Sequence, residues 1–328
     1  MVHIKTVAEE KQHEFLLSVI IPTYNRRDAL EKTLLALEKQ TLPKKYFEVI
    51  VVNDGSTDDT HEFATRYNNR GALHFTYIQK ENEGQGIARN TALGHSDGLV
   101  VLFCQDDIFP TETFLEEHWK VHEKYFTENF ICLGKTTWSP DAQITPCMVF
   151  MEEVGMQFKY VALEKKPLCD LELRLREASY DFFYTSNLSM KRSLFEKESF
   201  NTKFKKYGWE DIELGLRLHT EQHATILYNE RAFAYHYHHL DVEDMKKRME
   251  QVGKSARQAV KINPRLQSII PRGLKKLLFS LISTEVVMSF LEKQSRPYQN
   301  STKSPLPFWL KAYFYALMKK HFLKGLHA

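Results

Sequence analysis

The sequence predicts an α/β protein built on a Rossmann-like, mostly parallel β-sheet with helices on both faces. Strand-like and helix-like patterns alternate over the first hundred residues, as they do in βαβ units. The strand-like runs are almost continuously apolar, which is typical of parallel strands that are covered on both sides. Polar residues follow each run, and the carboxyl ends of parallel strands share one edge of the sheet, where ligands bind.

The first four strands are short runs of apolar and β-branched residues, expected at 15–22, 46–53, 74–79 and 99–104. Segments with helical spacing or helix-capping residues lie between them, at 28–40, 58–67 and 87–95. The first of these helices carries Leu30, Leu34 and Leu37 near helical spacing. The second strand ends in Asp54 and Gly55, which indicate a turn.

Beyond the fourth strand the pattern is less regular. We expect an amphipathic helix, an irregular proline-containing segment, a second helix, and then a strand, a turn and a strand, at 111–125, 130–205, 208–219 and 225–238. The remaining residues, from Val242 onward, are expected to be mostly helical, with breaks near Pro264 and Pro271. The sequence therefore predicts a C-terminal helical extension of the α/β fold.

The formal net charge of +3 conceals an uneven distribution. Residues 246–328 carry 17 Lys or Arg against 3 Asp or Glu, a net charge of +14, whereas the rest of the chain has 28 against 39, a net charge of −11. Hydrophobic residues make up 43% of the sequence and charged residues 27%, which excludes a disordered, collagen-like or coiled-coil chain. A mildly acidic body is thus joined to a strongly basic C-terminal region.

The four cysteines lie far apart and form no Cys-x-x-Cys pair, so we expect buried thiols rather than disulfides or zinc ligands. No secretory signal is recognisable near the N-terminus. No run approaches the roughly 20 apolar residues that a membrane span needs. We therefore expect a cytoplasmic protein that does not cross a membrane.

Polar residues gather at successive strand ends, and their types suit a nucleotide. An acid can hydrogen-bond a base or a ribose, and an arginine can neutralise phosphate oxygens. The candidate nucleotide-binding residues are Pro22, Thr23, Tyr24, Asn25, Asp54, Asn82, Arg89, Gln105 and Asp106. Taken singly, Asp54 reads as a turn cap and Arg89 as a surface charge, whereas the set as a whole favours a ligand site.

Asp106 and Asp107 directly follow an apolar strand, where carboxylates are costly unless they meet a cation or hydrogen-bond donors. Hard divalent cations prefer carboxylate oxygens and bridge readily to phosphate. Period-two alternation puts His236 and His238 on one face of the late strand, and imidazole beside carboxylate suits Mn²⁺ somewhat better than Mg²⁺. The alternatives are that the acids cap a helix and that His238 and His239 are ordinary polar groups beneath the basic region.

Glu210 and Asp211 lie at the expected start of a helix, where the dipole and the free N–H groups favour ionised carboxylates. A capping role accounts for one of the two acids. Trp209 precedes them, and its flat apolar ring beside an acid is typical of a platform that binds a carbohydrate acceptor.

Five motifs occur in an order that resembles glycosyltransferase family 2, the inverting enzymes of the GT-A fold. The motifs are Val19–Arg26, Val51–Asp58, Asn82–Asn90, Gln105–Asp107 and Gly208–Asp211. Together they cover roughly residues 15–240 and are highly specific. The resemblance implies that Asp54 contacts the base, that Arg89 lies near the diphosphate, that Asp107 and His236 hold a divalent metal ion, and that Asp211 is the catalytic base.

Gln105 departs from the family pattern, because the metal motif is commonly Asp-x-Asp and this chain has glutamine at the first position. Gln105 can hydrogen-bond a ribose or a metal-bound water but supplies no charge. The metal is therefore assigned to Asp107 rather than to Asp106, and Asp106 is grouped with the residues that bind the nucleotide sugar.

The resemblance implies an inverting transfer from a nucleotide diphosphate sugar, most simply a UDP-sugar, to a carbohydrate or lipid-linked glycan in polysaccharide biosynthesis. Asp211, with Glu210 beside it, would deprotonate the acceptor hydroxyl, while Mn²⁺ or Mg²⁺ on Asp107 would stabilise the leaving group. This mechanism requires Asp107 and Asp211 to line one cleft. The expected domains are an N-terminal extension, a nucleotide-sugar-binding half, an acceptor-binding and catalytic half, and a basic helical region, at 1–14, 15–110, 111–245 and 246–328.

Two other functions stay open. A sugar-nucleotide pyrophosphorylase also uses such a sheet, although Pro22–Arg26 lacks the glycine content of its phosphate loop. A catalytically silent carbohydrate-binding relative would keep the fold without the reaction. A dehydrogenase is disfavoured because no Gly-x-Gly-x-x-Gly follows the first strand.

The basic C-terminal region has two interpretations. Segments 274–282 and 308–322 mix aliphatic or aromatic residues with lysine, as helices at an anionic membrane surface do, which would place the protein at the inner face of the cell membrane. The same helices could instead pack on the catalytic body or on another subunit of a homo-oligomer. We expect no nucleic-acid partner, because no reading motif accompanies the charge.

Overall fold

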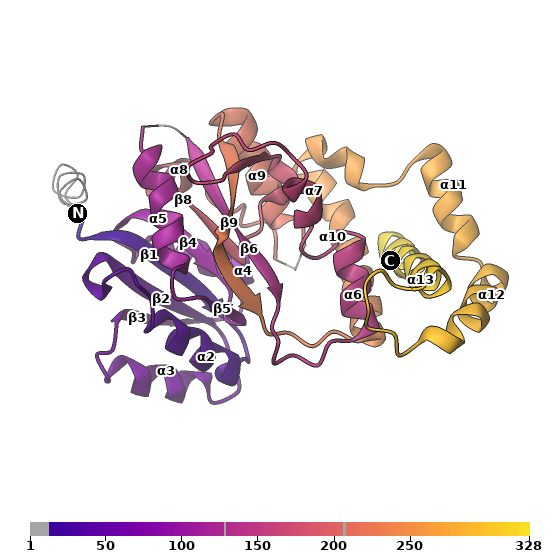
Figure 1. Ribbon diagram of the computed structural model, residues 1–328, viewed down its shortest axis with the longest axis horizontal. Coiled ribbons are helices and arrows are strands. Elements are labelled where there is room, and N and C mark those ends of the chain that lie inside the picture. The colour runs from indigo at the N-terminus through magenta and orange to yellow at the C-terminus, as the bar shows by residue number, and fades with distance from the viewer. Residues whose placement is uncertain (1–12, 128, 206–207) are drawn as a thin grey trace. The chain divides into compact units, whose positions relative to one another are not determined.

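The computed structural model describes residues 13–127, 129–205 and 208–328 (Figure 1). Most of the expected N-terminal extension, 1–14, lies outside the described residues. The described chain forms two compact units. The first contains 13–139, 160–205 and 214–237, and the second contains 140–159, 208–213 and 238–328. The domain boundaries expected from the sequence remain predictions.

The first unit is built on one sheet with the strand order β3-β2-β1-β4-β8-β6-β9-β5, to which β7 is added through β9. The first four strands are parallel to their neighbours: β1 (Phe15–Thr23), β2 (Phe47–Asp54), β3 (His74–Lys80) and β4 (Gly98–Cys104). Every residue of β1, β2 and β4 is buried. These three strands are therefore covered on both faces, as their continuous apolar runs predict.

Helices cover the two faces of the sheet. Side chains of α2 (Arg27–Leu37), α3 (Thr60–Asn68) and α5 (Phe114–Lys124) form one core cluster with alternate residues of the strands, such as Val19 and Leu102. On the other face, α4 (Gln85–Leu93) lies against β1 and β2, and Phe103 packs edge-on against Phe195 of α8 (Arg192–Lys197). The predicted α/β fold class is confirmed.

The second half of the sheet brings in strands that are distant in sequence: β5 (Ile108–Pro110), β6 (Phe130–Trp138), β7 (Arg176–Ala178), β8 (Asn187–Lys191) and β9 (Thr225–His236). β8 is antiparallel to β4 and β6, β5 and β7 are antiparallel to β9, and β6 is parallel to β9. The remaining helices of the first unit are α7 (Tyr160–Glu164) and most of α9 (Glu210–Glu221).

The expected strand, turn and strand at 225–238 is wrong, because β9 is one continuous strand. Its register against β6 shifts between Gly134, which pairs with Asn229, and Lys135, which pairs with Phe233. The side chain of Asn187 donates hydrogen bonds at this bulge to the carbonyl oxygens of Lys135 and Ala232. A Cβ atom on Gly134 would lie 2.2 Å from the Asn187 side chain, so the bulge needs glycine there.

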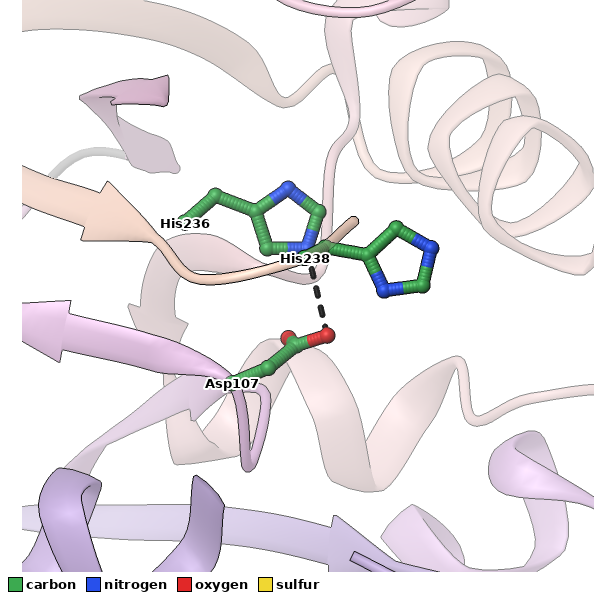
Figure 2. Close-up of side chains that lie close together, drawn as sticks. All are labelled: Asp107, His236 and His238. Atoms are coloured by element: carbon green, nitrogen blue, oxygen red, sulfur yellow. Dashed lines mark ion pairs between the residues drawn. The ribbon is translucent and has the colours of Figure 1, made fainter. Parts of the chain in front are cut away.

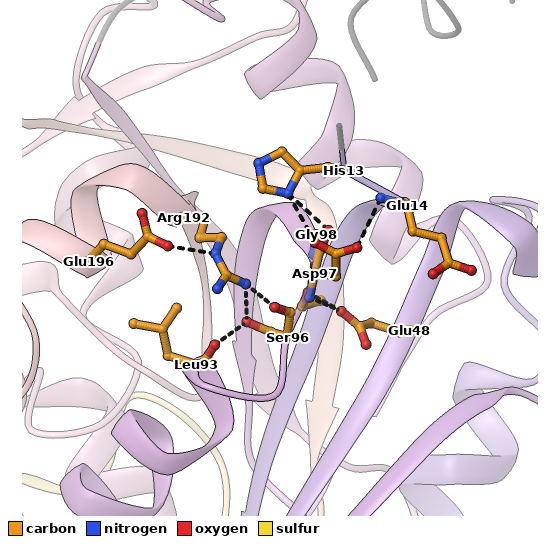
Figure 3. A network of polar contacts seen from close by, with 10 residues as sticks. His13, Glu14, Glu48, Leu93, Ser96, Asp97, Gly98, Arg192 and Glu196 are labelled. Atoms are coloured by element: carbon orange, nitrogen blue, oxygen red, sulfur yellow. Dashed lines mark hydrogen bonds and ion pairs between the residues drawn. The ribbon is translucent and has the colours of Figure 1, made fainter. Parts of the chain in front are cut away.

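A polar network ties three parallel strands together at their amino ends (Figure 3). The hydroxyl of Ser18 donates to the carboxylate of Glu48 at 2.7 Å and accepts from the backbone N–H of Gly98 at 2.8 Å. Glu48 also accepts from the backbone N–H of Asp97, and its burial raises the pKa of the carboxyl group. Arg192 extends the network by donating to Ser96. These hydrogen bonds fix the register of β1, β2 and β4 at their amino ends, whereas the ligand is expected at their carboxyl ends.

The second unit is mostly helical, as predicted for the C-terminal region. It contains α6 (Pro146–Glu153), α10 (Val242–Ile262), α11 (Gly273–Ile282), α12 (Glu285–Ser295) and α13 (Phe308–His327). The helices α10 and α13 cross closely at Gly253 and Gly325, where an added Cβ would lie 2.2 and 2.0 Å from backbone oxygens of the opposite helix. Among the described residues, no helix has both the length and the apolar character of a membrane span.

The cysteines are free thiols in the described residues, as expected, but not all are buried. Cys104, Cys132 and Cys147 are buried, whereas Cys169 is exposed, contrary to the prediction. Cys169 lies in an irregular connection outside the named helices and strands, and its thiol donates to the carbonyl of Leu175.

Candidate active site

The sheet brings two acidic residues and a histidine together beyond the end of β4. Asp106 and Asp107 follow β4 directly and are almost fully buried. His236, at the end of β9, pairs in register with Ile108 of β5, so it lies next to the acids. Its Nε2 is 3.2 Å from Oδ2 of Asp107, and the N–H of Tyr237 donates to the backbone carbonyl of Asp107 at 2.8 Å. Strand pairing therefore places His236 beside Asp107.

An aromatic ring orients this histidine. Trp138, at the end of β6, is the register partner of His236, and the two rings stack with centroids 5.4 Å apart and planes inclined by 13°. The backbone N–H of Ser139 donates to the carbonyl of His236. Reading the sequence did not identify Trp138 as a site residue, because the parallel pairing of β6 with β9 has no local signal.

Two side chains of this region fit a metal ion. Nε2 of His236 and Oδ2 of Asp107 face each other, as the dashed line in Figure 2 marks. A carboxylate oxygen with an imidazole nitrogen is a donor set that suits Mn²⁺ and other divalent transition metals. Asp107 and His236 belong to the same unit.

Arg26, just past β1, is a cation that contacts both acids. Its guanidinium contacts Oδ2 of Asp107 and lies 3.3 Å from Oδ1 of Asp106. Burial, together with the negative charge of Asp107, raises the pKa of Asp106 above its usual range, although Arg26 and the Thr23 hydroxyl act in the opposite direction. Arg26 was not identified as a site residue from the sequence. Its position just past the first strand, at the same edge of the sheet, was the available signal.

Asp54 ends β2 and is held by the next loop. Its carboxylate lies 2.9 Å from Nζ of Lys80 and accepts hydrogen bonds from the N–H groups of Glu83 and Gly84. Asn82 belongs to the same loop and is exposed, and its backbone approaches Gly55 so closely that a Cβ there would meet it at 2.8 Å. The structure thus brings Asp54 and Asn82 to adjacent loops, as the strand-end argument predicts.

The residues after β1 occupy the neighbouring loop. Pro22 and Thr23 end the buried strand, whereas Tyr24 is exposed. Asn25 adopts a positive φ of 53°, and its side-chain oxygen accepts from the N–H of Thr57 at 2.7 Å. Asn25 therefore links the loops that follow β1 and β2.

Arg89 lies on α4 and is buried, so its interpretation as a surface charge is wrong. Its guanidinium donates to the side chain of Gln85 and lies over the ring of Phe200, 5.4 Å from the centroid. The contact of Arg89 with a donor diphosphate stays a prediction. Gln105, between β4 and the two acids, is half-buried.

The start of α9 carries the remaining predicted residues. Gly208 and Trp209 both have positive φ, 108° and 75°, and the latter is unusual for a bulky side chain. The indole N–H of Trp209 donates to the carbonyl of Val252 at 3.0 Å. Glu210 is buried and accepts from the N–H of Gly208 at 2.8 Å, whereas Asp211 occupies the first turn and is half-buried. The carboxylate that supports the turn is thus Glu210.

Relatives of known name are glycosyltransferases. The chain is 29% identical over 221 residues to a validoxylamine A glucosyltransferase of Streptomyces hygroscopicus, an alignment that covers 63% of this chain and 52% of that protein. It is 40% identical over 108 residues to the poly(ribitol-phosphate) β-N-acetylglucosaminyltransferase TarS of Staphylococcus aureus, covering 31% of this chain and 19% of that protein. The chain thus spans about half the length of the first of these relatives.

Two solved structures have the same fold. The mannosyltransferase PcManGT from Pyrobaculum calidifontis, in complex with GDP-Man and Mn²⁺, has a TM-score of 0.59 at 16% identity and covers 96% of this chain and 92% of its own. TarS 1–349 of S. aureus in complex with UDP-GlcNAc has a TM-score of 0.52 at 18% identity and covers 95% of this chain and 90% of its own. At such identities the likeness establishes the fold alone.

The family model described as glycosyl transferase family 2 matches residues 18–197, which is more than half of the 328 residues. The matched part contains most of β1, all of β2, β3 and β4, and Asp107. The resemblance drawn from the motifs is therefore confirmed, and the chain belongs to glycosyl transferase family 2.

Proposed function

We propose that the chain transfers a sugar from a nucleotide diphosphate sugar to a hydroxyl group of a carbohydrate or lipid-linked glycan, with inversion at the anomeric carbon. The observation that carries the proposal is the buried pairing of Asp107 with His236 past the end of β4. The structures of TarS with UDP-GlcNAc and of PcManGT with GDP-Man and Mn²⁺ support a nucleotide-sugar donor. A UDP-sugar is the first candidate.

Asp107 and His236 would hold the divalent cation, with Mn²⁺ preferred to Mg²⁺ because one ligand is an imidazole. When bound, such a cation offsets the negative charge that develops on the diphosphate leaving group. Stacking on Trp138 keeps the ring of His236 in place, so less side-chain entropy would be lost when the cation binds. Asp106 keeps Arg26 at the same edge of the sheet, where the guanidinium can meet phosphate oxygens.

The donor would be held by the loops after the parallel strands. In this proposal Asp54 contacts the base, Arg89 lies near the diphosphate, and the loops that Asn25 links form the floor of the site. The other residues assigned to the nucleotide sugar are Pro22, Thr23, Tyr24, Asn82, Gln105 and Asp106. The support for this assignment is their common origin in loops at the carboxyl edge of the sheet.

Asp211 would accept the proton of the acceptor hydroxyl as that oxygen attacks the anomeric carbon. Its place in the first turn of α9 supports this role, because the helix dipole favours the ionised form that a base needs. Glu210 would keep the turn in shape through its hydrogen bond to Gly208. Trp209 offers its ring face to the acceptor sugar. A single displacement inverts the centre and needs no covalent intermediate.

The test is a screen of UDP- and GDP-sugars for slow, Mn²⁺-dependent hydrolysis and for transfer to oligosaccharide or lipid-linked acceptors. We expect one donor to release a nucleoside diphosphate and to yield a product of inverted anomeric configuration. Formation of free pyrophosphate from a nucleoside triphosphate and a sugar 1-phosphate would identify a pyrophosphorylase instead. Binding without turnover across the whole screen would favour the silent carbohydrate-binding relative.

Replacing Arg26 with Gln is expected to tighten Mn²⁺ binding in the absence of donor by about tenfold. The reason is that the guanidinium contacts both Asp106 and Asp107 and therefore competes with a second cation for the same oxygens. Isothermal titration calorimetry measures the affinity. Arg27→Gln is the matched control, because Arg27 pairs with Asp28 and Glu31 instead. Unchanged or weaker Mn²⁺ binding in the Arg26 variant would contradict the competition.

A further inference from the structure

The helix α11 exposes a regular apolar stripe. Leu274, Leu277, Leu278 and Leu281 stand at i, i+3, i+4 and i+7, and their relative solvent exposures are 72, 55, 50 and 54%. Leucines at this spacing form one face of an amphipathic helix, and in globular proteins that face normally packs on the core. No residue of α11 is buried. The stripe is therefore an apolar surface that the described chain leaves uncovered.

The opposite side of α11 holds the helix on its own unit. Nζ of Lys319, on α13, lies 4.6 Å from the ring centroid of Phe279 and 4.8 Å from that of Tyr315. Phe279 is half-buried, and the pairing of α11 with α13 runs along this side. In Figure 1, α11 and α12 both lie beside α13 within the C-terminal part of the chain, coloured orange to yellow. The leucines consequently face away from the contact that anchors the helix.

A second exposed apolar group lies on the following elements. Val286 and Phe290, one helical turn apart on α12, are 82 and 52% exposed. Phe290 and Phe308 both contact the ring of Trp309, at centroid distances of 5.8 and 5.1 Å. Aromatic rings of this kind are frequent in helices that lie at the boundary between lipid headgroups and acyl chains.

The segments before and after α12 carry only positive charge, whereas α12 itself contains Glu285 and Glu292. Residues 263–284 contain four arginines or lysines and no acid, and residues 293–328 contain seven and no acid. Lys275 and Lys319 share the ring of Phe279. Burial, together with the charge of Lys275, lowers the pKa of Lys319 to about 8. Lys311, Lys320 and Lys324 pair with acids of the second unit. The positive charge that favours an anionic partner is therefore that of Arg272, Lys275 and Lys276, at the start of α11.

We propose that α11 is an interfacial helix that docks the second unit on an anionic phospholipid surface. The leucine stripe would enter the boundary between headgroups and acyl chains, with Lys275 on its flank, and the positive charge of Lys275, Arg272 and Lys276 would attract lipid phosphates. A second copy of the chain fits the stripe less well, because a symmetric contact would bring two strongly basic surfaces together. The proposal concerns α11 alone and does not depend on which donor or acceptor the enzyme uses.

The test is co-sedimentation of the full chain with vesicles of phosphatidylcholine alone or mixed with phosphatidylglycerol. We expect binding to the mixed vesicles, weakening with added salt, and little binding to phosphatidylcholine. The double substitution Leu277→Ser and Leu281→Ser should lower the partition coefficient at least about tenfold, because two exposed leucines lose their lipid contact. Leu171→Ser is the matched control, since Leu171 is 82% exposed in the first unit, and it should bind as the unaltered chain does.

Lys276→Glu should weaken binding to the mixed vesicles and reduce its salt dependence, whereas Lys39→Glu, an exposed lysine of the first unit, should have little effect. Thermal unfolding should be the same for all variants, because the altered side chains are exposed. Absence of vesicle binding, or binding that the leucine and Lys276 variants retain, would overturn the proposal. Concentration-dependent association of the chain that the leucine variant abolishes, without vesicle binding, would assign the stripe to a second copy.

Discussion

Asp211→Asn is expected to lower the turnover number by about 10²- to 10⁴-fold while leaving the donor affinity nearly unchanged. Asparagine keeps the size of the side chain and its capacity for hydrogen bonding, but it cannot take a proton from the acceptor hydroxyl. The turn itself should survive, because the hydrogen bond from Gly208 goes to Glu210. Turnover is measured as nucleoside diphosphate release with a saturating acceptor, and donor affinity by calorimetry with Mn²⁺ present.

Asp28→Asn is the matched control for this substitution. Asp28 also lies in the first turn of a helix, α2, where it pairs with Arg27 at the surface. The control should retain full turnover, which would separate loss of the base from a general effect on helix N-termini. Undiminished transfer by the Asp211 variant would refute its assignment as the base and would direct attention to Glu210.

The first half of the fold was predictable because its signals are local. The expected strand at 15–22 is observed as Phe15–Thr23, and that at 99–104 as Gly98–Cys104. Each is a continuous apolar run ended by residues that favour a turn, so neither its type nor its boundary depends on the rest of the chain. The helices between the strands then predict parallel pairing, because the chain must return along a face of the sheet before it can start a parallel strand, and a helix usually makes this connection.

The second half was not predictable in the same way because its partners are distant in sequence. β6 pairs in parallel with β9, whose first residue follows about ninety residues later, and β8 inserts between β6 and β4. The residues of β9 that suggested a turn form a bulge, which exists because Gly134 on another strand leaves room for Asn187. Such a bulge has no signature within the strand that carries it.

The candidate site divides along the same line. Asp54, Asn82 and Asp107 end or follow parallel strands and therefore lie at one edge of the sheet. The apolar pattern of the strands and the βαβ topology are enough to predict this. Arg26 and Trp138 escaped prediction, because their roles depend on how far a side chain reaches and on which strand lies beside β9. Contacts made across the sheet, rather than along the chain, complete the environment of Asp107.

Asp107→Asn is expected to weaken Mn²⁺ binding by about a hundredfold and to lower turnover by about 10²- to 10³-fold. Asparagine removes the negative charge that pairs with a cation while keeping a side-chain oxygen near His236. The same change relieves the buried proximity of two carboxylates, since both the burial of Asp106 and the charge of Asp107 raise the pKa of Asp106. This relief offsets the loss of the charge contact between Arg26 and Asp107, so we expect the metal-free variant to unfold at a temperature no lower than that of the unaltered protein.

Asp170→Asn is the matched control for Asp107→Asn, because we expect the opposite effects on unfolding temperature and on Mn²⁺ affinity. Asp170 is a buried carboxylate of the first unit that lies 2.8 Å from Nζ of Lys124 and accepts hydrogen bonds from the hydroxyl of Tyr125 and the N–H of Leu173. Its substitution should lower the unfolding temperature and leave Mn²⁺ affinity unchanged. Neutralising a carboxylate that stabilises the fold lowers the unfolding temperature of the protein. Neutralising a carboxylate that binds a metal ion lowers the affinity for that ion. If the Asp107 variant loses stability and keeps its Mn²⁺ affinity, Asp107 belongs to the first kind and the metal assignment is wrong.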